Sequence, residues 1–185
     1  MQGPSRNTTF VTTYDYWQEQ PWAVTRDPSL AFDAELLDEA LEVWRAQSGP
    51  AGVPQRSALS ARTLKPFLPN LVIVERQDDG RYRIRLMGSR ISLMIGEMQG
   101  HMLEECLPPD AVKRWTDAFD SVLSELRPVR YVSSVTVLDL DFLRAEILLA
   151  PLLDGAQRPV MVLAVATFRS RASADRAARP LALEA

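Results

Sequence analysis

The chain has one histidine, His101, and one cysteine, Cys106, and these are the side chains best suited to holding a metal ion or a haem iron. A single imidazole can serve as an axial haem ligand. His101 follows Gly100 in a stretch without regular period, so we expect it to contact solvent or a hydrogen-bonding partner instead. A tetrahedral zinc site would need carboxylates such as Glu104 and Glu105, and their spacing does not require one. The sequence therefore predicts no metal site and disfavours haem.

A nucleophile in a recognisable catalytic setting is also lacking. The sequence has no Gly-x-Ser-x-Gly elbow and no paired carboxylates in a pattern typical of acid–base chemistry. Serine, histidine and aspartate are present, but any chain with one histidine offers that combination. We therefore predict that the protein is not an enzyme and has no catalytic residues.

Charge and composition narrow the class of protein further. The net charge is -3 and the basic residues are scattered, so we expect no nucleic acid partner. No apolar run reaches the roughly 18 residues that cross a membrane, and the first residues do not resemble a secretory signal. A single cysteine cannot form an intramolecular disulfide, which fits a reducing compartment. We expect a cytoplasmic globular protein without a membrane span.

Arginines and methionines are the remaining side chains with a suggestive arrangement. Arg81, Arg83 and Arg85 alternate along one segment, and they would form either an anion-binding row or a solvated strand face. Four methionines fall close together, where they would form an accommodating pocket or fill a core: Met87, Met94, Met98 and Met102.

These residues lie in and after a predicted hairpin. Residues 71–76 are rich in strand formers, Gln77-Asp78-Asp79-Gly80 is a strong turn signal, and residues 81–87 alternate basic and apolar side chains. The alternation places Tyr82, Ile84 and Leu86 on one buried face.

Helical spacing of apolar residues predicts the helices around this hairpin. Residues 33–47 form an amphipathic helix, capped by Asp33, with Leu37, Leu41 and Trp44 on its apolar side. Ser60 is predicted to cap a short helix, residues 89–95 to form another, and Asp110 to cap a longer helix that ends at Arg127-Pro128.

Three further strands are predicted at residues 129–138, 143–149 and 160–168, joined by short turns and therefore paired antiparallel. The resulting fold class is α+β, with a five-stranded antiparallel sheet that buries one face under helices and is preceded by the amphipathic helix. Residues 1–32 are expected to be an irregular arm, residues 33–170 the domain, and residues 171–185 a flexible tail.

The order of elements and several short motifs resemble a PAS domain, and more closely the bacterial family of small stand-alone PAS proteins once grouped as a domain of unknown function. The resemblance covers about residues 32–170. It is carried by Val53-Pro54-Gln55-Arg56-Ser57, Leu68-Pro69-Asn70-Leu71, Arg85-Leu86-Met87-Gly88-Ser89-Arg90, Ile95-Gly96 through Gly100-His101, and Leu107-Pro108-Pro109-Asp110.

The resemblance implies the PAS fold and a role in signal transduction, and it assigns structural roles to Pro54, Arg56, Arg85 and Gly88. Guanidinium groups suit such roles because they bond specifically to carboxylates and backbone carbonyls. Light-sensing relatives use a cysteine to form a flavin adduct, but the residues around Cys106 do not resemble their Asn-Cys-Arg motif. Flavin is therefore disfavoured together with haem, and the cofactor stays unknown.

Two functions remain open. The first is a stand-alone regulatory module that forms a homodimer or docks to a signalling protein partner through Leu37, Leu41 and Trp44, although these side chains could equally cover their own sheet. The second is a small-molecule sensor that binds an apolar or amphipathic metabolite in an interior cavity. Its expected lining is Ile73, Tyr82, Ile84, Leu86, Ile91 and Met94, together with apolar residues of the last strands.

Overall fold

The computed structural model of the chain describes residues 24–137 and 140–170, so the expectations for residues 1–23 and for the tail 171–185 fall outside the described residues. The helices are α2 (Glu35–Ala46), α3 (Ala61–Leu64), α4 (Ser89–Ile95), α5 (Leu103–Cys106) and α6 (Pro109–Glu125), with 3-10 turns at Arg56–Ala58 and Leu68–Asn70. The strands are β1 (Val24–Asp27), β2 (Leu71–Arg76), β3 (Tyr82–Met87), β4 (Val129–Val137), β5 (Leu140–Leu153) and β6 (Pro159–Ser170).

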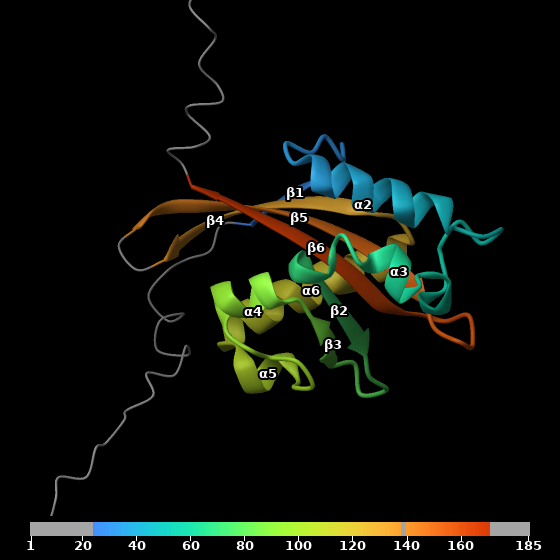
Figure 1. The fold of residues 1–185 in the computed structure, drawn as a ribbon. Coiled ribbons are helices and arrows are strands. Elements are labelled where there is room, and N and C mark those ends of the chain that lie inside the picture. The colour runs from blue at the N-terminus through green and yellow to red at the C-terminus, as the bar shows by residue number, and fades with distance from the viewer. Residues whose placement is uncertain (1–23, 138–139, 171–185) are drawn as a thin grey trace, which may run out of the picture.

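The described strands form one antiparallel sheet of six strands in the order β1-β4-β5-β6-β2-β3, where five were predicted (Figure 1). The additional strand, β1, pairs with β4 from Val24 opposite Ser133 to Asp27 opposite Arg130. It lies inside the expected irregular arm of residues 1–32, so that expectation is wrong for these four residues. A strand this short has no readable alternation, and its pairing depends on the edge that β4 offers.

Helices cover both faces of the sheet, whereas the sequence predicted one buried face. Figure 1 shows α2 on one side of the long strands and α4 and α5 on the other. Two separate apolar clusters result, one between the sheet and the α4–α6 region and one between the sheet and the α2–α3 region. The near-continuous apolar run from Ile147 to Leu153 in β5 fits this arrangement, because a strand buried on both faces has no polar side.

A β-bulge in the first hairpin changes which residues share a face. Ile73 pairs with Leu86 and Val74 pairs with Ile84, so Arg85 is an extra residue on β3. One extra residue reverses the inward and outward alternation beyond it. Leu86 therefore packs with Ile73 in the α2–α3 cluster, and its predicted place beside Tyr82 and Ile84 is wrong.

The ends of the helices agree only in part with the predicted caps. The Ser60 hydroxyl accepts a hydrogen bond from the backbone N–H of Thr63 at 3.1 Å, which confirms the predicted cap of α3. Helix α6 begins at Pro109, so Asp110 lies in its first turn and does not cap it. The helix ends with Leu126 in the left-handed conformation (φ 54°), before the predicted Arg127-Pro128 stop.

Helix α2 packs its apolar side against the sheet of the same chain. Leu37, Leu41 and Trp44 are all buried in the α2–α3 cluster. The indole N–H of Trp44 donates a 2.8 Å hydrogen bond to the carbonyl of Pro151. These three side chains cover their own sheet, which is the second of the two roles considered for them.

Asp33 does not cap α2, because Ala34 occupies the N-cap position without a side-chain bond. Its carboxylate instead lies 3.4 Å from the guanidinium of Arg130. Arg130 is buried, with ion pairs of 2.6 Å to both Glu146 and Asp27. The Asp27 carboxylate accepts hydrogen bonds from Ser29 and, with a smaller effect, from Arg130, and these bonds lower its pKa to about 2. This cluster fastens β1 and the start of α2 to the sheet.

No helix in the described part of the chain is both long enough and apolar enough to span a membrane.

Candidate functional site

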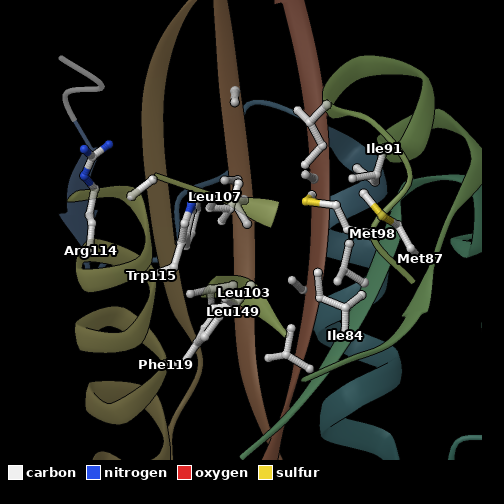
Figure 2. Close-up of a pocket in the computed structure, with 18 of the residues that line it drawn as sticks. Ile84, Met87, Ile91, Met98, Leu103, Leu107, Arg114, Trp115, Phe119 and Leu149 are labelled. Carbon is white, nitrogen blue, oxygen red and sulfur yellow. The ribbon is translucent and has the colours of Figure 1, made fainter. Parts of the chain in front are cut away.

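An apolar cavity of about 120 Å³ lies between the sheet and the helices α4, α5 and α6 (Figure 2). Strand residues form its floor: Val72, Val74, Ile84, Ala145, Ile147, Leu149, Ala164 and Ala166. The end of β3 and the helices and loops that follow it form its roof and walls: Met87, Ile91, Ile95, Met98, Leu103, Leu107, Ala111, Trp115 and Phe119. Asn70, Arg114 and Phe168 complete the lining.

Small residues on the floor keep this space open. Ala145 and Ala166 are buried on the cavity face of β5 and β6, and Ala164 lies on the same face. Larger side chains at these positions would fill the space below the helices, since protein interiors normally close-pack. On the opposite wall, Phe119 of α6 contacts Tyr82 of β3 at 5.1 Å between ring centroids, and within α6 it stacks on Trp115 at 5.8 Å.

Gly88 positions the roof helix α4. Its N–H donates a 2.7 Å hydrogen bond to the carbonyl of Leu71, which holds the start of α4 against the Leu68–Asn70 turn. A β-carbon at Gly88 would lie only 2.0 Å from the Leu68 carbonyl oxygen. The glycine therefore lets α4 approach closely enough for Ile91 to reach the cavity.

The loop after α4 is fastened to the outer edge of β3. The Ile84 N–H donates to the carbonyl of His101 at 2.9 Å, and the Gly100 N–H donates to the carbonyl of Ile84 at 2.8 Å. The side-chain oxygen of Gln99 accepts a 3.0 Å bond from the Met87 N–H. These bonds occupy the free edge of the sheet and place Met98 in the cavity, opposite the α6 wall (Figure 2).

The structure brings together only part of the residue set that the sequence predicts for a ligand cavity. Ile84 and Ile91 line the cavity. Tyr82 belongs to the same apolar cluster but stays outside the lining. Its hydroxyl donates a 2.7 Å bond to Asp120, and burial, followed by this carboxylate, raises the phenol pKa above its usual value.

The other predicted lining residues lie elsewhere. Both Ile73 and Leu86 pack on the opposite face of the sheet: Ile73 because β2 alternates regularly between Val72 and Val74, which line the cavity, and Leu86 because of the bulge at Arg85. Met94 is half-buried on α4 and does not line the cavity. Met87 and Met98, singled out in the sequence as pocket or core residues, do line it.

The α6 wall is what sequence reasoning missed. Both Trp115 and Phe119 lie in the longer helix predicted after Asp110, and nothing in the local pattern of that helix indicates that they face a cavity. The alanines of β5 and β6 were a further available signal, since three small residues on one face of paired strands leave volume unfilled.

The single histidine and the single cysteine lie outside the cavity. The His101 ring is 61% exposed, with its Nδ1 3.2 Å from the Glu105 carboxylate. Cys106 is half-buried at the edge of the α4–α6 cluster, and burial, followed by the charge of Glu105, raises its thiol pKa. Within residues 24–137 and 140–170, no three His, Cys, Asp or Glu side chains are grouped so as to hold a metal ion. Haem and flavin stay disfavoured as predictions.

The motif residues with expected structural roles make local contacts. Arg56 donates a 2.9 Å bond to the carbonyl of Leu59, and Arg85 lies 3.3 Å from the Glu75 carboxylate. The carbonyl of Pro54 accepts a 3.0 Å bond from the N–H of Leu153, which ties the loop after α2 to the end of β5.

The three arginines of the hairpin are all exposed. Arg81 lies 2.7 Å from the carboxylate of Asp79, and Arg85 pairs with Glu75 as described above. Arg83 alternates with them along β3. Their side chains form a solvated strand face.

Comparisons with known proteins agree with this architecture. The model of the PAS domain family matches residues 33–167. A search of curated proteins finds no significant match. Solved structures similar to this chain include the light-state LOV domain of the blue-light photoreceptor Aureochrome1, at 16% identity and a TM-score of 0.42, covering 62% of this chain and 92% of that one.

Two further solved structures are similar. A light-oxygen-voltage domain examined with a flavin analogue matches at 20% identity and a TM-score of 0.40, covering 62% of this chain and 87% of that one. An RNA-binding light-oxygen-voltage receptor matches at 11% identity and a TM-score of 0.43, covering 80% of this chain and 38% of that one.

Proposed function

We propose that this chain, which belongs to the PAS domain family, is a sensor module that takes up a small apolar or amphipathic ligand in the cavity below α4, α5 and α6. The observation that carries the proposal is the cavity itself. It has a lining that is almost wholly apolar, a floor of small residues, and a roof held in place by backbone hydrogen bonds. Concave apolar sites of this kind are the usual location of small ligands.

Binding or release of a ligand in this cavity can alter the arrangement of other elements of the domain. The cavity touches the roof helix α4 and the strands β5 and β6, which carry α2 on their other face. A ligand that binds one arrangement of the roof better than another shifts the population toward that arrangement. Such a population shift lets the domain respond to a ligand that it binds but does not convert, so we propose no enzymatic activity.

The alternative function, an interaction module that docks through α2, is less well supported. It needs Leu37, Leu41 and Trp44 at the surface, but all three pack on the sheet. The homodimer and the signalling protein partner stay predictions, and any such contact would have to use other residues.

A cavity-filling variant tests the sensor function. Ala164 lies on the cavity floor, so Ala164→Leu adds three carbon atoms into the open space. We expect benzene, used as a neutral probe, to raise the unfolding temperature of the wild-type chain and to have little effect on the variant, because a ligand stabilises only the state it can enter. Ala46→Leu, at the exposed end of α2, is the matched control and should respond as the wild type does.

Native mass spectrometry of the chain purified from its own host provides the second measurement, and it should detect a retained small molecule. The proposal fails if benzene stabilises the wild type and Ala164→Leu equally, or if benzene does not bind and no molecule is retained.

A further inference from the structure

We infer that the ligand of this cavity is a compact apolar monocarboxylic acid, whose carboxylate is bound at the cavity edge by Arg114 and the indole N–H of Trp115. The inference rests on the proposed sensor function and adds the chemical class of the ligand. Three features of the site carry it: the size of the cavity, the polarity of its lining, and two hydrogen-bond donors on α6 that have no partner among the described side chains.

The cavity volume limits the apolar part of the ligand. Its volume of about 120 Å³ is slightly below the roughly 150 Å³ of an engineered apolar cavity that accepts benzene. A body of about six carbon atoms, as one ring or a short branched chain, is therefore the largest that fits without movement of the roof. A long acyl chain or a fused-ring cofactor would extend beyond the enclosed space.

The interior offers few partners for a polar ligand body. Among the lining residues only Asn70 and Arg114 carry a polar side chain other than the indole. The amide nitrogen of Asn70 is already engaged, since it donates a 2.6 Å bond to the carbonyl of Ala166. A hydroxyl or amide placed deep in the cavity would lose its bonds to water without replacement, which is unfavourable.

Arg114 is the exception at the edge of this lining. It is half-buried, and none of the carboxylates whose side chains the structure describes, which leaves out Asp141, lies within ion-pair distance of it. Its neighbour Lys113 differs, because it pairs with Asp117 at 2.6 Å. A half-buried guanidinium without a carboxylate is a site where an anion would supply the missing charge.

Trp115, the next residue of α6, adds a second donor. Its indole N–H donates to no acceptor among the described residues, leaving aside the side chains of 133–143, which the structure does not describe. Figure 2 shows the Trp115 ring reaching into the cavity, with its nitrogen and the Arg114 guanidinium both directed toward the end at which α6 begins. A carboxylate has two oxygens that these donors can serve, whereas a phosphate monoester would bring more acceptors and more charge than the two side chains satisfy.

Benzoate and benzamide form a matched pair of probes, because they share a ring and a planar head and differ in charge. We expect calorimetric titration of the full chain to show tighter binding of benzoate than of benzamide. Arg114→Gln should weaken benzoate binding at least about tenfold, the loss typical of a charge-assisted hydrogen bond, and change benzamide binding less than about twofold.

Two further variants control for indirect effects. Arg90→Gln removes an exposed guanidinium of α4 that likewise has no ion pair among the described residues, and it should leave both affinities unchanged. Arg114→Lys keeps the charge but loses the planar donor pair, so it should bind benzoate with intermediate affinity.

The acid assignment is overturned if benzamide binds the wild type as tightly as benzoate, or if Arg114→Gln leaves benzoate binding unaltered. In either case the sensor function still stands, provided that Ala164→Leu abolishes binding of the neutral probe. If benzoate, benzamide and benzene all fail to bind the wild type, the acid assignment fails, and the sensor function then depends on a retained molecule alone.

Discussion

Gly88 lies where β3 passes into α4, and its α-carbon faces the backbone of the Leu68–Asn70 turn. The β-carbon of a Gly88→Ala variant would lie 2.0 Å from the Leu68 carbonyl oxygen and 2.6 Å from the carbonyl carbon of Pro69. Ordinary contacts begin at 3.4 Å, so one of the two segments must move by about 1.4 Å, the difference between 3.4 and 2.0 Å. A backbone movement of this size also breaks the 2.7 Å bond from the Gly88 N–H to Leu71.

Two costs follow from that movement. Overpacking of a tight site costs about 1–3 kcal/mol. Leaving a buried backbone group without its hydrogen bond costs about 1–3 kcal/mol more. We therefore expect Gly88→Ala to lower the free energy of unfolding by about 4 kcal/mol in urea denaturation, with a lower midpoint and an unchanged slope.

Gly155→Ala is the matched control, because nothing lies within 4 Å of a β-carbon built at this exposed turn. Its unfolding free energy should stay within about 1 kcal/mol of the wild type. Gly88→Ala protein that still folds should also bind benzene less tightly than the wild type, because displacement of α4 moves Ile91 out of the roof. A Gly88→Ala protein as stable as Gly155→Ala would refute the close approach that we derive for α4.

Three further predictions concern the α2 face and the buried arginine. Trp44→Phe removes the donor to the buried Pro151 carbonyl and part of the packing of α2, so urea denaturation should show a loss of about 2–4 kcal/mol. Glu146→Gln removes the charge opposite the buried Arg130 and should cost about 3 kcal/mol in the same assay, and an unchanged midpoint would contradict the ion pair. The pKa of Asp27 is lowered from 3.8 to about 2 on folding, so its contribution to stability is complete above pH 3.8 and lost as the pH falls toward 2. Urea midpoints measured across this range should fall more steeply for the wild type than for Asp27→Asn.

Local patterns in the sequence predicted most of the secondary structure. The strand at residues 71–76, its Gly80 turn and the helix at residues 89–95 were placed at their observed bounds because each has its own signal of period and breakers. Of the last three strands, the predicted residues 129–138 closely match β4, whereas 143–149 and 160–168 are shorter than β5 and β6. In β5 the structure extends to Leu153 through Pro151, a residue that normally argues against a strand.

Contacts between distant residues explain what the sequence did not reveal. Asp33 has the chemistry of a helix cap, but Arg130, nearly a hundred positions away, draws its carboxylate into a buried cluster. The bulge at Arg85 is a single residue within a regular alternation, and it moves Leu86 to the other face of the sheet. Neither the Asp33–Arg130 contact nor the bulge can be recognised from the local spacing of polar and apolar residues.

The cavity was only half predictable for the same reason. On one side of the cavity, the positions of Ile84 and Ile91 can be predicted from the alternation of β3 and the helical spacing of α4. Trp115 and Phe119 close the other side, and their position depends on how α6 packs over the sheet. An unfilled volume is a property of several elements together, so no single segment of the sequence indicates it.

The methionines allow the central claim, that the cavity receives a small ligand, to be tested directly. Met87 and Met98 line the cavity, whereas Met161 packs in the cluster on the opposite face of the sheet. In a methyl NMR titration of methionine-labelled protein with benzene, the signals of Met87 and Met98 should shift and saturate while that of Met161 stays in place. Unmoved signals for Met87 and Met98, or a shift of Met161 as large as theirs, would contradict the claim.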